Sequence, residues 1–379
     1  MTTQTPQKHW TARIEWPVAL FLIITPLAAL ILTPLYFMSV GFQWPLLVFS
    51  LIFAAATNLS VTAGYHRLFS HKSYDAHPVA KALFLLIGAS GFQGSALKWS
   101  SDHRRHHTHI DGDKDPYNIN EGFWYAHMGW LFLKESVDQK IQAPDLEKDW
   151  MVTFQHKYYV PLAIITGFGV PTLIGWMMGS PWGGFVIAGI LRIVLTQQST
   201  FFVNSLCHTL GKQTYSKDIS ARDSVFVAFL THGEGYHNFH HKFQIDYRNG
   251  IKWYHWDPTK WTIRTLSFMG LAYKLRQISN IEILKARLHA ESAELQHHGF
   301  AEDKIIMMKE KILEAQTRIK KLREDYAQFK VDAAKKREEL KDAYDHKLAE
   351  IKREIEIAKM EFEVGMKQWH AHRRAIPIS

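Results

Sequence analysis

Histidine residues in one short stretch have the spacing of metal ligands. The segment His103-Arg104-Arg105-His106-His107 places three histidines at positions i, i+3 and i+4. On a helix these positions share one face, so His103, His106 and His107 would point their imidazoles into one volume. The stretch therefore predicts a metal-binding helix.

Two other clusters repeat the pattern and raise the number of imidazoles to eight. His237, His240 and His241 have the same spacing, while His66 and His71 stand five residues apart. Imidazole ligands without thiolate suit iron, zinc or copper. Eight ligands exceed what one tetrahedral ion takes, so the clusters indicate two metal ions.

The composition narrows the class of protein. The 379 residues are enough for one large domain or two. A single cysteine, Cys207, excludes a disulfide framework and a cysteine-rich zinc or iron–sulfur site. The net charge is +9, but the basic residues do not gather in one patch. We therefore expect anionic lipid as the partner and no nucleic acid.

Four apolar segments are long enough to cross a bilayer. They are predicted at about residues 16–38, 44–63, 158–179 and 183–203. The first is long and no small-residue cleavage site follows it, so we expect a retained anchor. Residues 79–97 are apolar but short and are expected to be re-entrant or interfacial. Arg192 lies inside the fourth segment, where a charge usually faces protein or a cavity.

The distribution of basic residues predicts the topology. Lys and Arg are numerous before the first span, in residues 64–157 and after residue 208, and they are absent from both short turns between spans. The positive-inside rule then places both termini and all three histidine clusters in the cytosol. The predicted fold is an all-α integral membrane protein, with four transmembrane helices and a cytosolic helical cap that holds the histidine-rich di-metal site.

The C-terminal third of the sequence is charged and differs from the rest. Apolar residues such as Ile305, Ile312 and Ile319 follow a heptad seam, and a break is expected at residues 297–300. We predict a membrane domain over residues 1–275, a charged coiled-coil-like helical tail over 280–366 and a C-terminal end over 367–379. The tail could self-associate or lie back on the cytosolic domain.

The histidine clusters and their flanking residues resemble those of the membrane fatty acid desaturases, specifically the acyl-CoA Δ9 (stearoyl-CoA type) desaturases. The similarity covers roughly residues 15–275 and not the tail. It rests on five segments: Gly64-Tyr65-His66-Arg67-Leu68-Phe69-Ser70-His71, Trp99 to His107 with Asp115-Pro116, His127 to Leu131, Asn204 to His208, and Gly233 to His241.

The resemblance implies a di-iron centre with nine histidine ligands and an acyl tunnel. Asn204 would hold one iron through a water molecule, Gln93 and Trp99 would line the tunnel entrance, Thr200 would help to bend the tunnel, and Lys134 would contact the carrier's phosphates. Separately, we expect Asp102, Asp113 and Glu234 to hydrogen-bond the ligands. The implied ligands are His66, His71, His103, His106, His107, His208, His237, His240 and His241.

The activity implied is O2-dependent desaturation of a long-chain saturated acyl group, with electrons from a separate donor. Two Fe ions cycling between Fe2+ and Fe3+ would serve the reaction, and zinc is an alternative occupant of a purified sample because availability also decides binding. A membrane di-iron hydroxylase of alkanes or lipids is the alternative. A zinc hydrolase would need a motif such as HExxH, which is absent. A metal transporter would place its ligands near the midplane of the spans.

Several partners stay open at this point. The donor could be a ferredoxin, a rubredoxin or a cytochrome b5, and the acyl carrier could be CoA, acyl-carrier protein or a phospholipid. Chain length, double-bond position, oligomeric state and the role of the tail are not determined by these motifs. A bacterial inner membrane is expected as the host membrane.

Overall fold

The computed structural model describes residues 14–134, 142–335 and 341–374. The outer ends of the predicted membrane domain and of the predicted C-terminal end therefore lie outside the described residues. The chain divides into two compact units: Met1–Gln213 with Asp218–Gln277, and Thr214–Lys217 with Ile278–Ser379.

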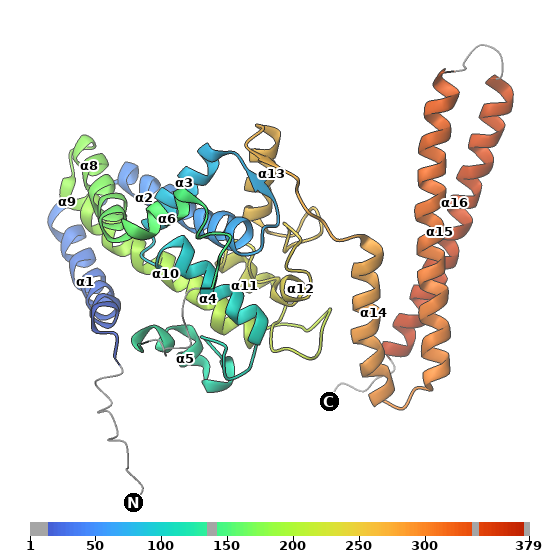
Figure 1. The fold of residues 1–379 in the computed structure, drawn as a ribbon, viewed down its shortest axis with the longest axis horizontal. Coiled ribbons are helices and arrows are strands. Elements are labelled where there is room, and N and C mark those ends of the chain that lie inside the picture. Colours follow the sequence, from blue (N-terminus) through green and yellow to red (C-terminus); the bar gives the residue numbers. More distant parts are fainter. Residues whose placement is uncertain (1–13, 135–141, 336–340, 375–379) are drawn as a thin grey trace, which may run out of the picture. The chain divides into compact units, whose positions relative to one another are not determined.

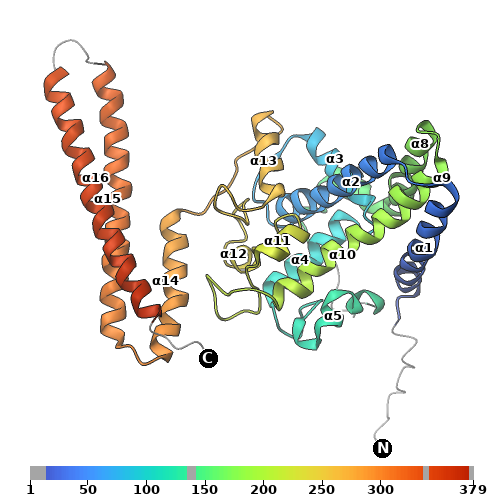
Figure 2. The ribbon, with the colours of Figure 1, turned by 180° about the vertical axis from the view of Figure 1, so that it is seen from behind.

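The first unit is helical, and its described residues include four helices that are long and apolar enough to cross a membrane. Figures 1 and 2 show α2 and α10 running side by side. The spans are built from α1 (Trp16–Val40), α2 (Trp44–Leu59) with the π-helix η2 (Ser60–Ser70), α7 (Tyr159–Ile164) with η5 (Ile165–Gly169) and α8 (Val170–Met177), and α9 (Pro181–Gly183) with η6 (Gly184–Leu191), α10 (Arg192–Ser205) and η7 (Leu206–His208).

The second and fourth spans are longer than the sequence predicted. They reach Ser70 and His208 and contain 27 and 28 residues, whereas the apolar runs end near residues 63 and 203. At 1.5 Å per residue each is about 40 Å long, against a hydrocarbon thickness of about 30 Å. The helices continue past the apolar runs because their polar residues are buried in protein. These final turns carry histidines.

Shorter helices fill the polar regions between and after the spans. The apolar segment predicted as re-entrant or interfacial forms a 12-residue helix, α3, which is too short to cross the bilayer. These elements are α3 (Pro78–Ala89), α4 (Ala96–His109), η3 (Ile119–Glu121), α5 (Phe123–His127), η4 (Gly129–Phe132), α6 (Trp150–Lys157), α11 (Val225–Leu230), α12 (His237–Lys242) and α13 (Pro258–Phe268), with the antiparallel strands β1 (Asp75–Ala76) and β2 (Ala272–Tyr273).

Arg192 joins the helices deep in the bundle. Its guanidinium is 1% exposed and donates to the carbonyls of Ser90 at 2.9 Å and Gly167 at 3.0 Å. It also lies 4.5 Å from the Phe53 ring centroid. As predicted, this charge faces protein, and backbone carbonyls take the place of water around it.

The described residues of the second unit form the helices α14 (Asn280–His297), α15 (Glu302–Lys335) and α16 (Lys341–Arg374). The expected break after His297 is present, where Gly299 has a positive φ of 82°. Ile305, Ile312 and Ile319 are buried, as the heptad seam predicts. The last helix continues past the predicted boundary at residue 366, because the fully buried Trp369 packs into the core of this unit.

Candidate metal centre

The first histidine pair lies on the π-helical end of the second span. The amide of His71 donates to the carbonyl of His66 at 3.1 Å, which is the i→i+5 hydrogen bond of a π-helix. This wider turn brings the two rings to 4.8 Å between centroids. A spacing of five, which an α-helix would place on different faces, therefore serves one site.

The other two clusters lie on helices, as their spacing predicts. Ser95 begins α4 as its N-cap, with its hydroxyl accepting from the amide of Lys98 at 3.2 Å. The third cluster occupies α12, a helix of six residues. Within each cluster the side chains fan out enough to serve two neighbouring sites.

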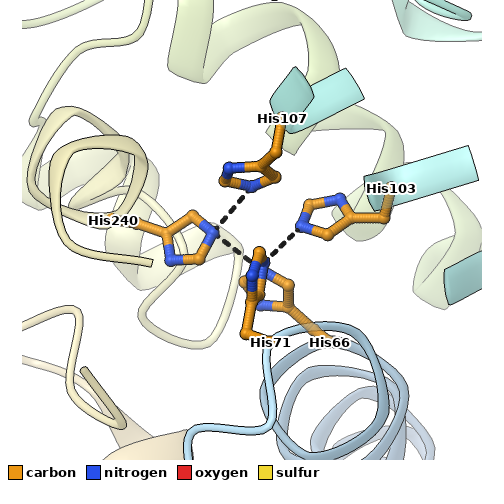
Figure 3. A group of neighbouring side chains, drawn as sticks. All are labelled: His66, His71, His103, His107 and His240. Atoms are coloured by element: carbon orange, nitrogen blue, oxygen red, sulfur yellow. Dashed lines mark hydrogen bonds between the residues drawn. The ribbon is translucent and has the colours of Figure 1, made fainter. Parts of the chain in front are cut away.

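Nine imidazoles come together in two groups that could each hold a metal ion. In each group the candidate ligand atoms lie within 4.8 Å of one another. The members come from the second and fourth spans, α4 and α12, and Figure 3 shows the larger group. The groups are His66, His71, His103, His107 and His240, and His106, His208, His237 and His241.

The inward nitrogens of the five-histidine group face one another directly. Nε2 of His240 lies 2.9 Å from Nε2 of His66 and 3.0 Å from Nε2 of His107, and Nε2 of His71 lies 2.8 Å from that of His103. Convergent imidazole lone pairs repel unless a cation or proton lies between them. This donor set fits a transition metal bound by neutral imidazole.

The four-histidine group fits a metal for a further reason. Nε2 of His241 lies 3.2 Å from that of His106 and 3.0 Å from that of His237. The fourth member, His208, has a buried Nε2 without a hydrogen-bond partner in the described part of the chain. A buried orphan imidazole nitrogen costs free energy, and a metal ion would satisfy it.

Burial favours the neutral form of four of these imidazoles. Removal from water, and then the neighbouring histidines, hold the pKa of His103, His107 and His240 well below its usual range. Burial and the adjacent His107 and His237 do the same for His241. A neutral imidazole is the form that binds a metal.

Outer hydrogen bonds fix the tautomer of two ligands through carboxylates. Nδ1 of His66 lies 2.9 Å from Glu234 Oε2, and Nδ1 of His106 lies 2.8 Å from Asp115 Oδ1. An imidazole that donates from Nδ1 must present the lone pair of Nε2 inward. The carboxylates therefore leave Nε2 of both rings free of a proton, which is the form that a metal ion requires.

Two further ligands are held by hydroxyl groups. Nδ1 of His103 lies 3.1 Å from the Tyr117 hydroxyl, and Nδ1 of His208 lies 2.7 Å from the Ser220 hydroxyl, which in turn contacts Asp111. Four of the nine imidazoles are thus oriented through Nδ1 by polar groups of the cap.

Of the three expected carboxylate partners, Glu234 is confirmed by its contact with His66. Asp102 pairs with Lys98 and Arg105, and Asp113 is exposed. The missed partner Asp115 lies nine residues after His106 in a loop, and loop geometry is not encoded in helical periodicity. The family resemblance did include the Asp115-Pro116 pair after the second histidine cluster, and this pair could have pointed to Asp115 as a partner.

Glu234 also belongs to a buried network of ion pairs. The Arg67 guanidinium donates to Glu234 at 2.8 Å and to Asp257 at 3.0 Å, and all three side chains are at most 3% exposed. Burial alone would raise the pKa of Glu234, but the charge of Arg67 and the hydrogen bonds from His66 and Arg67 lower it to about 2. Glu234 is thus a permanent carboxylate, which strengthens its hydrogen bond with His66.

A pocket opens beside the two groups and contains several of the predicted substrate residues. Trp99, Thr200 and Asn204 line it, together with His66 and His106. Gln93 donates from Nε2 to the Thr200 hydroxyl at 3.0 Å. Lys134, the predicted phosphate contact, is exposed and is not among the described residues that line the pocket.

These features define a class of protein: a membrane protein with a histidine-rich centre able to hold two metal ions beside a pocket. The chain belongs to the fatty acid desaturase family, because the model of that family matches residues 42–275.

Curated relatives include acyl-CoA desaturase 1 of Saccharomyces cerevisiae, 43% identical over 251 residues, which are 65% of this chain and 49% of that protein. Stearoyl-CoA desaturase 5 of Bos taurus is 38% identical over 62% of this chain and 73% of its own length. The Delta(9)-fatty-acid desaturase fat-7 of Caenorhabditis elegans is 35% identical over 69% of this chain and 79% of its own length. The chain spans about half the length of the S. cerevisiae relative.

Proposed function

We propose that this protein desaturates a long-chain saturated acyl group, carried as acyl-CoA, to a cis-monounsaturated acyl group at the Δ9 position, with O2 as co-substrate. The observation that carries the proposal is the convergence of nine imidazoles at the wall of a pocket. The relatives' names, acyl-CoA desaturase and Delta(9)-fatty-acid desaturase, support the substrate class and the position.

The proposed centre is a pair of iron ions. His66, His71, His103, His107 and His240 would hold one, and His106, His208, His237 and His241 the other, with Asn204 contributing through a water molecule. The ions supply the oxidising power that unactivated C–H bonds require, which amino-acid side chains lack. Overall, two hydrogens leave the acyl chain, two electrons come from a donor protein and two protons from water, and O2 is reduced to two water molecules.

The protein's own residues position the acyl chain and shape the centre. Trp99 and Thr200 would hold one C–C bond of the chain beside the ligands, and Gln93 fixes the Thr200 hydroxyl. Glu234 and Asp115 keep the imidazoles in the required tautomer. Lys134 remains a proposed contact of the carrier's phosphates, made at the exposed surface.

The proposed setting is a bacterial inner membrane, with both termini and the two histidine groups (together the histidine layer) on the cytosolic side. A separate donor protein of the ferredoxin, rubredoxin or cytochrome b5 type would then reach the centre from that side. We also propose residues 1–275 as the desaturase domain and residues 280–366 as a helical tail for self-association.

Fatty acid analysis of cells that express the chain tests the proposal. Total fatty acids are compared by gas chromatography for the unaltered protein, for His237→Ala and for His109→Ala, a matched control whose exposed imidazole belongs to neither group. We expect one cis-Δ9 monoene to rise with the unaltered protein and with His109→Ala, and to return to background with His237→Ala. A hydroxylated chain instead would identify a hydroxylase and contradict desaturation.

A further inference from the structure

An exposed apolar surface lies on the element that leads to the third histidine cluster. In α11 the side chains of Val225, Phe226 and Phe229 are 66%, 63% and 63% exposed, while Val227 and Ala228 between them are fully buried. This short helix is therefore anchored by one face and presents large apolar side chains on the other. Single exposed apolar residues are common, but a contiguous group usually marks an interaction surface.

Two tryptophans extend this surface. The Trp256 ring lies 5.3 Å from that of Phe229 and 5.4 Å from that of Trp261, so the rings form a continuous row. Both indoles are about two-fifths exposed. We call this set the aromatic patch: Val225, Phe226, Phe229, Trp256 and Trp261.

Two charged side chains near the aromatic patch are buried and directed away from it. Lys260 is 5% exposed and its ammonium donates to the carbonyls of Gly250 and Lys252, and Asp257 is fully buried against Arg67. Two cations stay exposed: Arg264 follows Trp261 by about one turn of α13, and Lys252 precedes Trp256 by four residues. Aromatic residues beside an exposed cation are the arrangement that suits an anionic lipid surface.

The aromatic patch is fixed to two spans at one depth. The Ser199 hydroxyl donates to the carbonyl of Leu230 at 2.6 Å, and the hydroxyls of Thr62 and Thr259 lie 2.7 Å apart. Thr62 and Ser199 each lie 18 positions after the first residue of their span, Trp44 and Pro181 respectively. At 1.5 Å per residue both contacts are about 27 Å from the far end, close to the hydrocarbon thickness of about 30 Å.

The patch is also continuous with a surface that must face lipid. Leu195 is 56% exposed and lies one helical turn before Ser199, on the same face of the fourth span. An apolar side chain exposed within a membrane span faces acyl chains. The next turn along this face is the one that contacts the end of α11.

We propose that the aromatic patch inserts into the boundary between headgroups and acyl chains, in the leaflet next to the histidine layer. Aromatic side chains prefer this depth because their rings are apolar and their edges tolerate water. The insertion holds α11, and Thr231 and His232 of the pocket wall that follow it, at a fixed height. This inference rests on the membrane setting and not on the reaction proposed above.

Depth-dependent fluorescence quenching tests this proposal. The native Cys207 is fully buried, so a thiol-reactive NBD probe can be directed to Phe226→Cys in the full-length protein reconstituted in phosphatidylcholine nanodiscs. The matched control is Lys114→Cys, an exposed position between Asp111 and Asp115, on the loop beyond the histidines. Metal content, measured for both variants, verifies that each is folded.

We expect NBD at position 226 to emit at shorter wavelength than NBD at 114, to be quenched by phosphatidylcholine carrying a doxyl group near the headgroup, and to resist aqueous iodide. The probe at position 114 should show the opposite pattern. Quenching of both probes by iodide alone would overturn the proposal, because the patch would then face water. Protection of position 226 from both quenchers would also overturn it and would indicate that protein covers the patch.

Discussion

The first compact unit contains the candidate membrane spans and is called the membrane unit, and the second is called the C-terminal unit. An ion network of the membrane unit is buried, whereas an ion pair of the C-terminal unit is exposed to water. Arg67, Glu234 and Asp257 are at most 3% exposed, and they contact one another and a metal-ligand candidate. Arg318 and Glu361, on α15 and α16, pair at 3.3 Å while each stays about half exposed. A buried pair costs desolvation that only good geometry offsets, whereas an exposed pair contributes little.

This difference indicates that the buried charged residues orient a candidate metal ligand, whereas the exposed charged residues keep the helices soluble. In the membrane unit an ion network is retained in a place where apolar residues would pack at lower cost, and it orients His66. In the C-terminal unit the core is mainly apolar, with Glu291 as a buried exception, and several ion pairs lie on the outside of the helices. Substitutions in the two units should therefore affect different properties.

The largest effect is expected from removing a ligand. His107→Ala deletes one of five inward imidazoles, so metal content should fall and acyl-chain desaturation should cease while the protein stays inserted in the membrane. Elemental analysis of the purified protein measures the loss. His109→Ala is the control, and unchanged metal in His107→Ala would remove this residue from the site.

Glu234→Gln tests the buried network. The amide keeps the shape of the side chain but loses the charge shared by His66 and Arg67, and loss of a group that orients a ligand typically lowers metal affinity about 10–100-fold. Competition with a chelator measures this affinity. Glu361→Gln makes the same chemical change on the exposed surface of the other unit and should leave affinity unaltered. If Glu234→Gln and Glu361→Gln bound metal with equal affinity, the buried network would have no special role at the metal centre.

Trp369→Ala should affect stability and not metal binding. The indole is fully buried and its Nε1 donates to Glu291 at 2.7 Å, so truncation should destabilise the C-terminal unit by about 3–5 kcal/mol. Limited proteolysis between residues 280 and 374 reports the loss. Val364→Ala, an exposed change on the same helix, is the control. Loss of metal from Trp369→Ala would show that the two units are energetically coupled.

The smallest effect is expected at the exposed pair. Arg318→Ala should change the free energy of unfolding of the C-terminal unit by less than about 1 kcal/mol, because water solvates both partners and salt screens them. Thermal melts at low and high salt measure this difference. A destabilisation as large as that of Trp369→Ala would mean that exposed charge holds this unit together.

Periodicity predicted the ligand helices well. The i, i+3, i+4 spacing placed three imidazoles on one region of α4, and apolar length located the starts of the spans. These features depend on local sequence alone. The ninth member, His208, has no neighbour at ligand spacing and was reached only through the family resemblance.

Features that depend on contacts between distant parts of the chain could not be predicted from the sequence. The ends of the second and fourth spans extend past their apolar runs because burial in protein replaces burial in lipid. The hydrogen bonds of Asp115 and Asp111 depend on how a loop folds across α4. The five-residue spacing of His66 and His71 becomes meaningful only once the helix is π-helical.

The central claim is that two neighbouring histidine groups form a dinuclear centre, and the metal-to-protein ratio tests it most directly. The full-length protein is purified from cells grown with iron, and its metal content is measured by elemental analysis together with its concentration from amino-acid analysis. The account predicts two ions per chain, of iron or of zinc that has replaced it. A ratio of one, with His241→Ala binding as much metal as the unaltered protein, would contradict the account.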